Sequence, residues 1–353
     1  MIWLGSEKKM KMKKLVLLTK SNVNALPEYY GYINTKLKER YKLYFIGENT
    51  LNKVKVKKED FGISITLPKQ KSRLKFYLKV FFILKKINPS IVHIFWFPLA
   101  SVIPLLSKIT FKKYITIGDF RTKSPFGGIK GKIKDIILKI ESLFFHKRIT
   151  LDETLSDFIF NKEADCYIPM GYDNTLFKNH NLEKDYDFIY AGSISKDRKI
   201  FDFIKEFNEI TDNKFKILII GWGDEANKIE ELASTKVNIS YLNKVSREEI
   251  PYYYSKSKIG ISYVDKNVLN IQQPTKILEY IACDISILAN NTIGTLELSS
   301  KLKFNGLIFS NLEELKLLNI NNLKLYNGKD INNYSWQYII ENRLMPFYES
   351  ILK

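Results

Sequence analysis

Cysteine and histidine are scarce in this sequence, and their scarcity excludes several kinds of site. The 353 residues include two cysteines and three histidines. Cys166 and Cys283 lie far apart without metal-ligand spacing, so no zinc site is expected and a reducing cytoplasm is favoured. A Gly-x-Ser-x-Gly motif and a Walker lysine loop are also missing. We therefore expect no metal and no cofactor.

Long apolar runs are missing as well. The longest, residues 91–106, is interrupted by His93, Pro98 and Pro104 and is too short to cross a bilayer. The first fourteen residues, MIWLGSEKKMKMKK, are too short and too charged for the core of a signal peptide. Both features predict a cytoplasmic protein.

Acidic side chains are under-represented in one half of the chain only. Residues 1–180 carry 34 Lys and Arg against 15 Asp and Glu, a net charge of +19, whereas the rest carry 22 against 23, a net charge of −1. A general lysine bias is the alternative explanation, but it would have charged both halves. The asymmetry favours an anionic partner for the first half: nucleic acid, an anionic membrane or an anionic substrate.

Short apolar runs alternate with helical patterns along the second half of the chain. This alternation is typical of a parallel, doubly wound α/β sheet. The predicted strands are 188–191, 216–220, 237–242, 259–264, 285–289 and 307–309, and the predicted helices are 199–210, 221–233 after its opening turn, 247–255, 274–282 and 311–318.

The first half repeats this pattern less regularly. Its predicted strands are 14–18, 42–46, 91–95, 114–117 and 148–150, and its predicted helices are 30–40, 73–86, 99–109 and 130–145. We therefore predict two Rossmann-like doubly wound domains that face a central cleft, with a polar linker near 172–185. The first domain is expected at 12–172, completed by a C-terminal helix at 334–353, and the second at 183–330. Ligands bind beyond the carboxyl ends of such strands, so the cleft is the expected site.

One predicted helix of the second domain carries groups suited to a ligand. It begins at Pro274, where the missing N–H costs nothing, and it follows the carboxyl end of a strand. Its free N–H groups, from Thr275 on, favour an anion. Lys276 and Glu279 are three residues apart and share a face, where lysine suits a phosphate and glutamate suits sugar hydroxyls. The alternative is a solvated ion pair worth ~0.3 kcal/mol.

Three further loops are expected at the same edge of the sheet. Their N–H groups and cations suit a diphosphate, and their backbone groups suit the edge of a nucleobase. The residues are Gly192, Ser193, Arg198 and Lys199 after the first strand, Asn243 and Val245 after the third, and Gly294 and Thr295 after the fifth. Taken singly, each loop could equally well be a solvated turn. The stronger indication of a ligand site is that several such loops are expected at one edge of the sheet.

The order of these segments resembles the family-four glycosyltransferases of the GT-B fold. The matching stretches are YAGSISKDRK, ILIIGWGDE, LNKVSREEIPYYYSKSKIGISYV and PTKILEYIACDISILANNTIGTLELS, with IPMGYDNTLF at the domain junction and SWQYIIENRLMPFYESIL as the C-terminal helix. The resemblance implies transfer of a sugar from a nucleotide donor, generally with retention at the anomeric carbon.

The resemblance also implies roles for single residues. Glu279 resembles the glutamate that binds the donor ribose, and Arg198 stands where the family has a diphosphate-binding lysine. Gly294 and Thr295 fall in the phosphate-facing loop of the family. The chain departs from the family pattern at three places. Ile271 replaces a glutamate, Ser193 replaces an arginine, and the Gly-Gly of the N-terminal loop is represented only by Gly31 in EYYGY.

The first domain offers candidates for the acceptor side. Asp119 and Arg121 follow a strand in ITIGDFRT, which resembles a D-x-R motif of some family members. We expect them to position the acceptor or act near the leaving group, so that with Glu279 they form the predicted catalytic set; a strand-end salt bridge is the alternative. His93, otherwise a packed core histidine, and Gly31 in EYYGY complete the acceptor-side set.

Two basic segments of the first domain suit an anionic bilayer surface. KQKSRLKFYLKVFFILKK and GGIKGKIKDIILKIESLFFHKR combine lysines with large apolar side chains. The alternative is that each helix packs its apolar side on its own sheet and solvates its lysines.

Together these features predict a retaining, metal-independent hexosyltransferase-type enzyme of bacterial surface-polysaccharide assembly, for lipopolysaccharide or capsule. We expect a UDP- or GDP-linked sugar as donor and a lipid-linked or cell-surface glycan as acceptor. The protein is expected at the cytoplasmic face of the inner membrane, as a peripheral protein. The alternatives are a GT-B nucleotide-sugar epimerase and a catalytically inactive partner subunit. A nucleic-acid-binding protein would need base-stacking aromatics in a recognised module, and none is present.

Overall fold

The computed structural model divides the chain into two compact units. It describes residues 12–22, 29–49, 53–70, 72–109, 114–122, 128–266, 270–271, 273–304, 306–319 and 329–353. Residues 1–11 of the charged start, and part of the loop that precedes Pro274, lie outside the described residues. Unit 1 comprises Met1–Arg121, Asp135–Ile168 and Ile340–Lys353, and unit 2 comprises Thr122–Lys134 and Pro169–Ile339.

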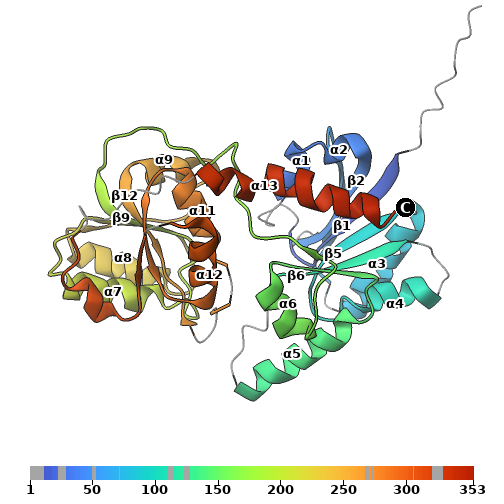
Figure 1. Ribbon diagram of the computed structural model, residues 1–353, viewed down its shortest axis with the longest axis horizontal. Helices are drawn as coiled ribbons and strands as arrows, with labels where there is room; N and C mark the ends of the chain where they lie inside the picture. Colours follow the sequence, from blue (N-terminus) through green and yellow to red (C-terminus); the bar gives the residue numbers. More distant parts are fainter. Residues whose placement is uncertain are drawn as a thin grey trace, which may run out of the picture. The chain divides into compact units, whose positions relative to one another are not determined.

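Unit 1 is built on one sheet with the strand order β3-β4-β2-β1-β5-β6-β7-β8 (Figure 1). Neighbouring strands are parallel except β3 and β4, an antiparallel hairpin at one edge. The central strand β5 is buried along its whole length, as expected for a parallel sheet covered on both faces. The strands are β1 Lys13–Leu18, β2 Tyr41–Asn49, β3 Lys55–Glu59, β4 Gly62–Pro68, β5 Ile91–Phe95, β6 Ile115–Phe120, β7 Lys147–Thr150 and β8 Cys166–Tyr167.

Helix α3, Arg73–Ile87, shows how a helix covers this sheet. Phe76, Val80, Leu84 and Ile87 recur every three or four residues and are all buried, so they form one apolar stripe. The other helices of this half are α1 Tyr29–Asn34, α2 Leu37–Arg40, α4 Val102–Ile109, α5 Gly128–Ser142 and α6 Glu153–Phe160. Within the described residues, no helix is long and apolar enough to cross a membrane.

Unit 2 is built on a fully parallel sheet with the strand order β11-β10-β9-β12-β13-β14. The chain moves outward from β9 to β11, then returns to the other side of β9 at β12. This reversal between β9 and β12 is the topological switch point where doubly wound sheets bind ligands. The strands are β9 Tyr186–Ala191, β10 Ile217–Ile220, β11 Ile239–Leu242, β12 Ser257–Ser262, β13 Ser286–Asn290 and β14 Leu307–Phe309.

Alternate side chains of the unit 2 strands enter two separate cores, one on each face of the sheet. Phe188 and Tyr190 of β9 pack in one core with Phe203 of α7, whereas Ile189 of β9 packs in the other with Ile277 of α11. The helices of this unit are α7 Ile200–Ile210, α8 Ala226–Thr235, α9 Ile250–Ser255, α11 Thr275–Ala282 and α12 Ile293–Leu302.

The end of the chain passes from unit 2 into unit 1. Helix α13, Trp336–Ile339, is followed by one π-helical turn, Ile340–Leu344, and by helix α14, Met345–Ser350. Pro346, the second residue of α14, has no N–H to donate, so an interrupted hydrogen-bond ladder is expected just before it. The division at Ile339 assigns α14 to unit 1.

Several predicted elements differ in detail from those observed. The predicted helix 30–40 divides into α1 and α2, and the predicted helix 311–318 is a short 3₁₀ turn, Leu312–Leu315. The hairpin of β3 and β4 and the helix α6 were not predicted. The stretch predicted as a linker, 172–185, contributes Tyr172 and Phe177 to the buried core of unit 2.

Candidate functional site

A pocket of about 390 Å³ opens at the carboxyl ends of β9, β10 and β11 in unit 2. The ends of these strands and the loops that follow them line the pocket, and helix α11 contributes the carboxylate of Glu279. The lining residues that matter most for a ligand are Gly192, Ser193, Trp222, Val245, Arg247 and Glu279. The pocket therefore lies at the edge where doubly wound sheets bind ligands.

Two glycines allow the loops of this pocket to approach each other closely. A Cβ atom at Gly221 would collide with the carbonyl oxygen of Gly192, and a Cβ atom at Gly192 would collide with the Lys276 ammonium. The Gly192 N–H donates to the carbonyl of Ile220 at 2.8 Å. Glycine in YAGS and GWG is therefore required by contact between two loops and a lysine.

Lys276 places its ammonium beside the Gly192 turn without a carboxylate partner. Its Nζ lies 3.7 Å from the centroid of the Tyr190 ring, and it forms no ion pair within the described part of the chain. Burial lowers the pKa of Lys276 well below its ordinary value, and the positive charge of Arg198 lowers it further, while Glu279 opposes the shift. An ammonium whose charged form is disfavoured in the absence of a ligand is suited to an anion.

The backbone of the same turn adds a donor to these cations. Ser193 is exposed, and its N–H has no acceptor among the residues whose structure is described. Its carbonyl, in the peptide that follows, accepts from the Tyr190 hydroxyl at 2.8 Å. The Ser193 N–H belongs to the turn beside which the Lys276 ammonium lies, and both groups suit a phosphate oxygen.

Glu279 is held by two side chains on the pocket side of α11. Arg247 Nη2 lies 3.9 Å from one carboxylate oxygen, and the Tyr254 hydroxyl lies 3.4 Å from the other. Burial raises the pKa of Glu279, an effect that the positive charges of Arg247 and Lys276 partly offset. A fixed carboxylate that lines a pocket is suited to accept hydrogen bonds from ligand hydroxyls.

The other predicted donor-site residues lie at varied distances from this pocket. Val245 lines it, and Asn243 lies beside its rim and accepts from the N–H of Lys244 at 2.7 Å. Thr275 begins α11 as predicted for the helix start. Lys199 forms an ion pair with Asp265 at 3.0 Å, so its ammonium is already engaged.

Gly294 and Thr295 are buried at the start of α12, and their N–H groups have partners within the chain. The Gly294 N–H donates to the carbonyl of Asn270 at 3.0 Å, and the Thr295 N–H donates to the side chain of Thr292 at 3.1 Å. A phosphate would have to displace these partners. The role predicted for this loop stays a prediction.

Sequence reasoning missed the aromatic and arginine side chains of the pocket. Trp222 is 59% exposed at the rim, with Lys244 Nζ 5.6 Å from its ring centroid. Arg247 stands 5.7 Å from the ring of Phe177 and beside Glu279. The available signal was position: Trp222 is the second residue after a predicted strand, at the edge where ligands bind.

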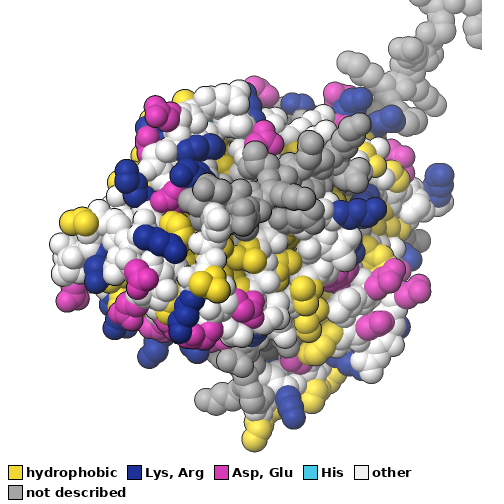
Figure 2. Space-filling model, turned by 60° about the vertical axis from the view of Figure 1, so that its left-hand side comes forward, with side chains coloured by type: hydrophobic (Ala, Val, Ile, Leu, Met, Phe, Trp, Pro, Cys, Tyr) yellow, Lys and Arg dark blue, Asp and Glu magenta, His cyan; other side chains and the backbone are white. Residues whose placement is uncertain are grey.

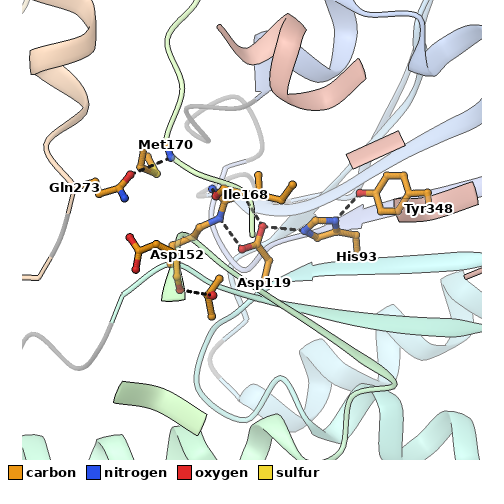
Figure 3. Close-up of polar contacts among 9 residues, drawn as sticks. His93, Asp119, Asp152, Ile168, Met170, Gln273 and Tyr348 are labelled. Carbon is orange, nitrogen blue, oxygen red and sulfur yellow. Dashed lines mark hydrogen bonds and ion pairs between the residues drawn. The ribbon is translucent and has the colours of Figure 1, made fainter. Parts of the chain in front are cut away.

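In unit 1, the predicted acceptor-side residues form one buried polar chain (Figure 3). Arg121 donates to both oxygens of Asp119, at 2.5 and 2.8 Å, and to the carbonyl of Ile168 at 3.0 Å. His93 Nε2 lies 3.0 Å from Asp119, and its Nδ1 lies 2.5 Å from the Tyr348 hydroxyl of α14. The chain of contacts connects two strand ends to the C-terminal helix.

The electrostatics of this chain are those of a satisfied core. Asp119 and His93 are buried. Burial alone would raise the pKa of Asp119, but Arg121 and His93 outweigh it and hold the pKa below its ordinary value. Gly31 lies buried within α1. The geometry agrees with the strand-end salt bridge, and the acceptor and catalytic roles of Asp119 and Arg121 stay predictions.

The two doubly wound units, each with parallel strands around a central first strand, define the architecture known as the GT-B fold. Residues 173–318, which contain the whole pocket, match the family described as "Glycosyl transferases group 1". No curated protein matches the sequence. The family match supports glycosyl transfer as the reaction class of unit 2.

Solved structures agree on the fold across almost the whole chain. Sucrose-phosphate synthase from Thermosynechococcus elongatus superposes with a TM-score of 0.74 at 14% identity, covering 97% of this chain and 99% of that one. A glycosyltransferase from Rickettsia africae gives 0.68 at 16% identity, covering 97% and 99%. The lipopolysaccharide outer core galactosyltransferase WaaB gives 0.65 at 12% identity, covering 96% and 99%. At these identities the similarity establishes the GT-B fold.

Proposed function

We propose that this protein is a retaining hexosyltransferase that uses a UDP- or GDP-linked sugar and needs no metal ion. The observation that carries the proposal concerns one face of α11 beside a pocket: Lys276, whose ammonium has no ion pair among the described residues, lies there with Glu279, a carboxylate held by two side chains. A nucleotide sugar has both chemistries that this pair suits: a diphosphate, and hydroxyls of ribose and sugar.

The proposed donor pose follows from the layout of unit 2. The diphosphate lies against Lys276, Arg198 and the Ser193 N–H, and Glu279 accepts from the ribose hydroxyls. The base lies toward Val245 and Trp222, whose exposed ring offers a stacking surface. Lys199 contributes less than predicted, because Asp265 already neutralises it.

Charge stabilisation of the departing diphosphate supports a mechanism without metal. The reaction develops negative charge on the diphosphate as the bond to the sugar breaks, and cations fixed in a half-buried site stabilise that charge. Two side-chain cations and one backbone donor at the Gly192 turn supply the positive potential. For comparison, removing one preorganised donor from the oxyanion hole of a protease costs about 2.7–4 kcal/mol.

The proposed acceptor is a lipid-linked or cell-surface glycan at the cytoplasmic face of a bacterial inner membrane, in lipopolysaccharide or capsule assembly. The net charge of +19 on residues 1–180 supports an anionic surface as partner of the first half. The fold shared with a lipopolysaccharide galactosyltransferase is consistent with this acceptor class.

Thermal shift with nucleoside diphosphates tests the donor site. UDP or GDP should raise the melting temperature of the wild type, and Glu279→Ala should abolish that response. Glu231→Ala, an exposed glutamate on α8 of the same unit, is the matched control and should respond like the wild type. Indifference of the wild type to all nucleoside diphosphates would refute the proposal.

Turnover assays separate transfer from the alternatives that the sequence leaves open. A transferase releases nucleoside diphosphate in proportion to glycosylated acceptor, whereas an epimerase yields an altered nucleotide sugar without acceptor. Binding of donor with neither product would identify an inactive partner subunit, the alternative raised by Ser193 and Ile271.

A further inference from the structure

Helix α5 exposes a continuous aliphatic face. Six side chains on and just after the helix are between 42% and 78% exposed: Ile129, Ile133, Ile136, Ile137, Ile140 and Leu143. Their spacing of three and four residues places them on one side of the helix. Single exposed aliphatic residues are ordinary, but six on one face are not.

The opposite face of the same helix is the one that packs. Leu138, Glu141 and Ser142 are buried, and Glu141 accepts from Trp96 Nε1 at 3.2 Å and from the Leu99 N–H at 2.8 Å. These bonds within unit 1 fix the rotation of α5 about its axis. The aliphatic face is therefore held outward by buried polar contacts.

Cations border this aliphatic face. Lys132 and Lys139 are exposed and seven residues apart, so they lie along the same side of the helix. Figure 2 shows hydrophobic side chains next to a basic one at its lower edge, and α5 is the lowest of the helices around the first sheet in Figure 1. An aliphatic stripe bordered by lysines is the pattern of a helix that lies in a membrane interface.

We propose that α5 docks this protein on an anionic lipid bilayer, with its isoleucine face inserted among the acyl chains and its lysines at the headgroups. This inference rests on the proposed function, because docking would give the enzyme access to a lipid-linked acceptor.

The charge of the chain favours a bilayer over a second copy of the same protein. Two copies would bring together chains of net charge +18 each, whereas anionic headgroups neutralise the lysines. A 15-residue helix is about 22 Å long and ~10 Å wide, so one face offers far less than the ~800 Å² per partner that stable dimers bury. A bilayer needs only the stripe itself.

Vesicle flotation tests this surface with matched variants. The wild type should float with phosphatidylglycerol vesicles and bind pure phosphatidylcholine weakly. Ile133→Asn/Ile140→Asn should lower the partition coefficient by about tenfold or more, because each buried aliphatic group adds to binding. Val237→Asn/Leu317→Asn, which changes two exposed aliphatic residues of unit 2, should bind like the wild type.

Insertion itself needs a separate readout. Tryptophan at Ile136→Trp should be quenched by lipids brominated in their acyl chains, and tryptophan at Val237→Trp should not. Equal quenching of both, full binding of the α5 double variant, or equal binding to both lipids would overturn the proposal. The proposal would also be overturned if sedimentation showed that the wild type and the unit 2 double variant are dimers and Ile133→Asn/Ile140→Asn is a monomer.

Failure here is distinguishable from failure of the proposed function. The nucleoside diphosphate response depends on the pocket of unit 2, which neither Ile133 nor Ile140 lines, so it should be unchanged in Ile133→Asn/Ile140→Asn. If the variant loses vesicle binding but keeps a normal nucleotide response, the effect lies in α5. If the wild type shows no nucleotide response, the donor proposal fails, and the vesicle result still tests the docking proposal.

Discussion

Replacing Lys276 with methionine removes a charge and keeps the length of the side chain. The Lys276 ammonium lies over the Tyr190 ring, and the thioether of a methionine can contact the ring in its place without carrying a charge. What disappears is the ammonium beside Gly192 and Ser193. The variant therefore isolates the role proposed for this cation, which is to hold the diphosphate of the donor.

The expected loss of affinity follows from one charge-assisted hydrogen bond. A hydrogen bond to a charged group contributes about 1.5–3 kcal/mol, so the affinity for UDP or GDP should fall by about 10- to 150-fold. The upper part of this range is expected, because Lys276 is half-buried and its interactions are weakly screened. The affinity for the corresponding nucleoside, which has no phosphate, should be unchanged.

Stability should change in the opposite direction to binding. The pKa of Lys276 is lowered because the folded protein disfavours its charged form. At neutral pH the charged group therefore costs stability in the absence of ligand, and Lys276→Met should have an equal or higher melting temperature than the wild type. A variant that is more stable and binds diphosphate worse is the signature of a ligand-directed cation.

Isothermal titration with UDP, GDP, uridine and guanosine measures these effects. Lys258→Met is the matched control, since Lys258 pairs with Asp187 at the opposite end of the sheet. Gly192→Ala is the second variant: its Cβ would displace the ammonium without changing the charge, so it should reproduce the selective loss. Equal losses for nucleoside and nucleoside diphosphate, or no loss for either, would refute the assignment of Lys276 to the diphosphate.

Two further predictions concern ionisation. Binding of a nucleoside diphosphate should raise the lowered pKa of Lys276, so the complex takes up protons and affinity falls as pH rises toward the ordinary lysine value of 10.5. Calorimetric titration in buffers of different ionisation heat measures this proton uptake. The uptake should vanish in Lys276→Met. Asp119→Asn should cost about 3 kcal/mol in urea unfolding, because it breaks a buried ion pair, while nucleotide binding stays normal. A fully stable Asp119→Asn that lost only sugar transfer would instead support a catalytic Asp119.

The fold was predictable where the sequence is apolar and regular. The strand predicted at 91–95 is β5, Ile91–Phe95, because a buried parallel strand is apolar on both faces and stands out from its surroundings. The hairpin of β3 and β4 was missed because β3, Lys55–Glu59, is polar and mostly exposed at the sheet edge. The spacing of apolar residues reveals which side chains are buried, and an exposed edge strand has few buried side chains.

The candidate site was predictable only in part, for a related reason. Helical spacing correctly placed Lys276 and Glu279 on one face of α11, because that relation is local. The partners of other residues depend on the course of loops. Asp265 takes Lys199 out of the set of available cations, and Arg247 reaches Glu279 from a segment 32 positions earlier. No periodic signal encodes such contacts.

The uneven charge of the chain is explained better by two separate anionic partners than by one. The pocket of unit 2 lies in the half whose net charge is −1, so its attraction for a diphosphate comes from a few cations fixed at short range. Such short, half-buried interactions are weakly screened by salt. The surplus of +19 lies in the other half, where exposed lysines such as Lys132 and Lys139 of α5 act at long range and are strongly screened. A protein that needed positive charge only for its donor would not carry it there. We therefore infer that the surplus serves a second anionic partner, as the proposed docking of α5 on an anionic bilayer requires.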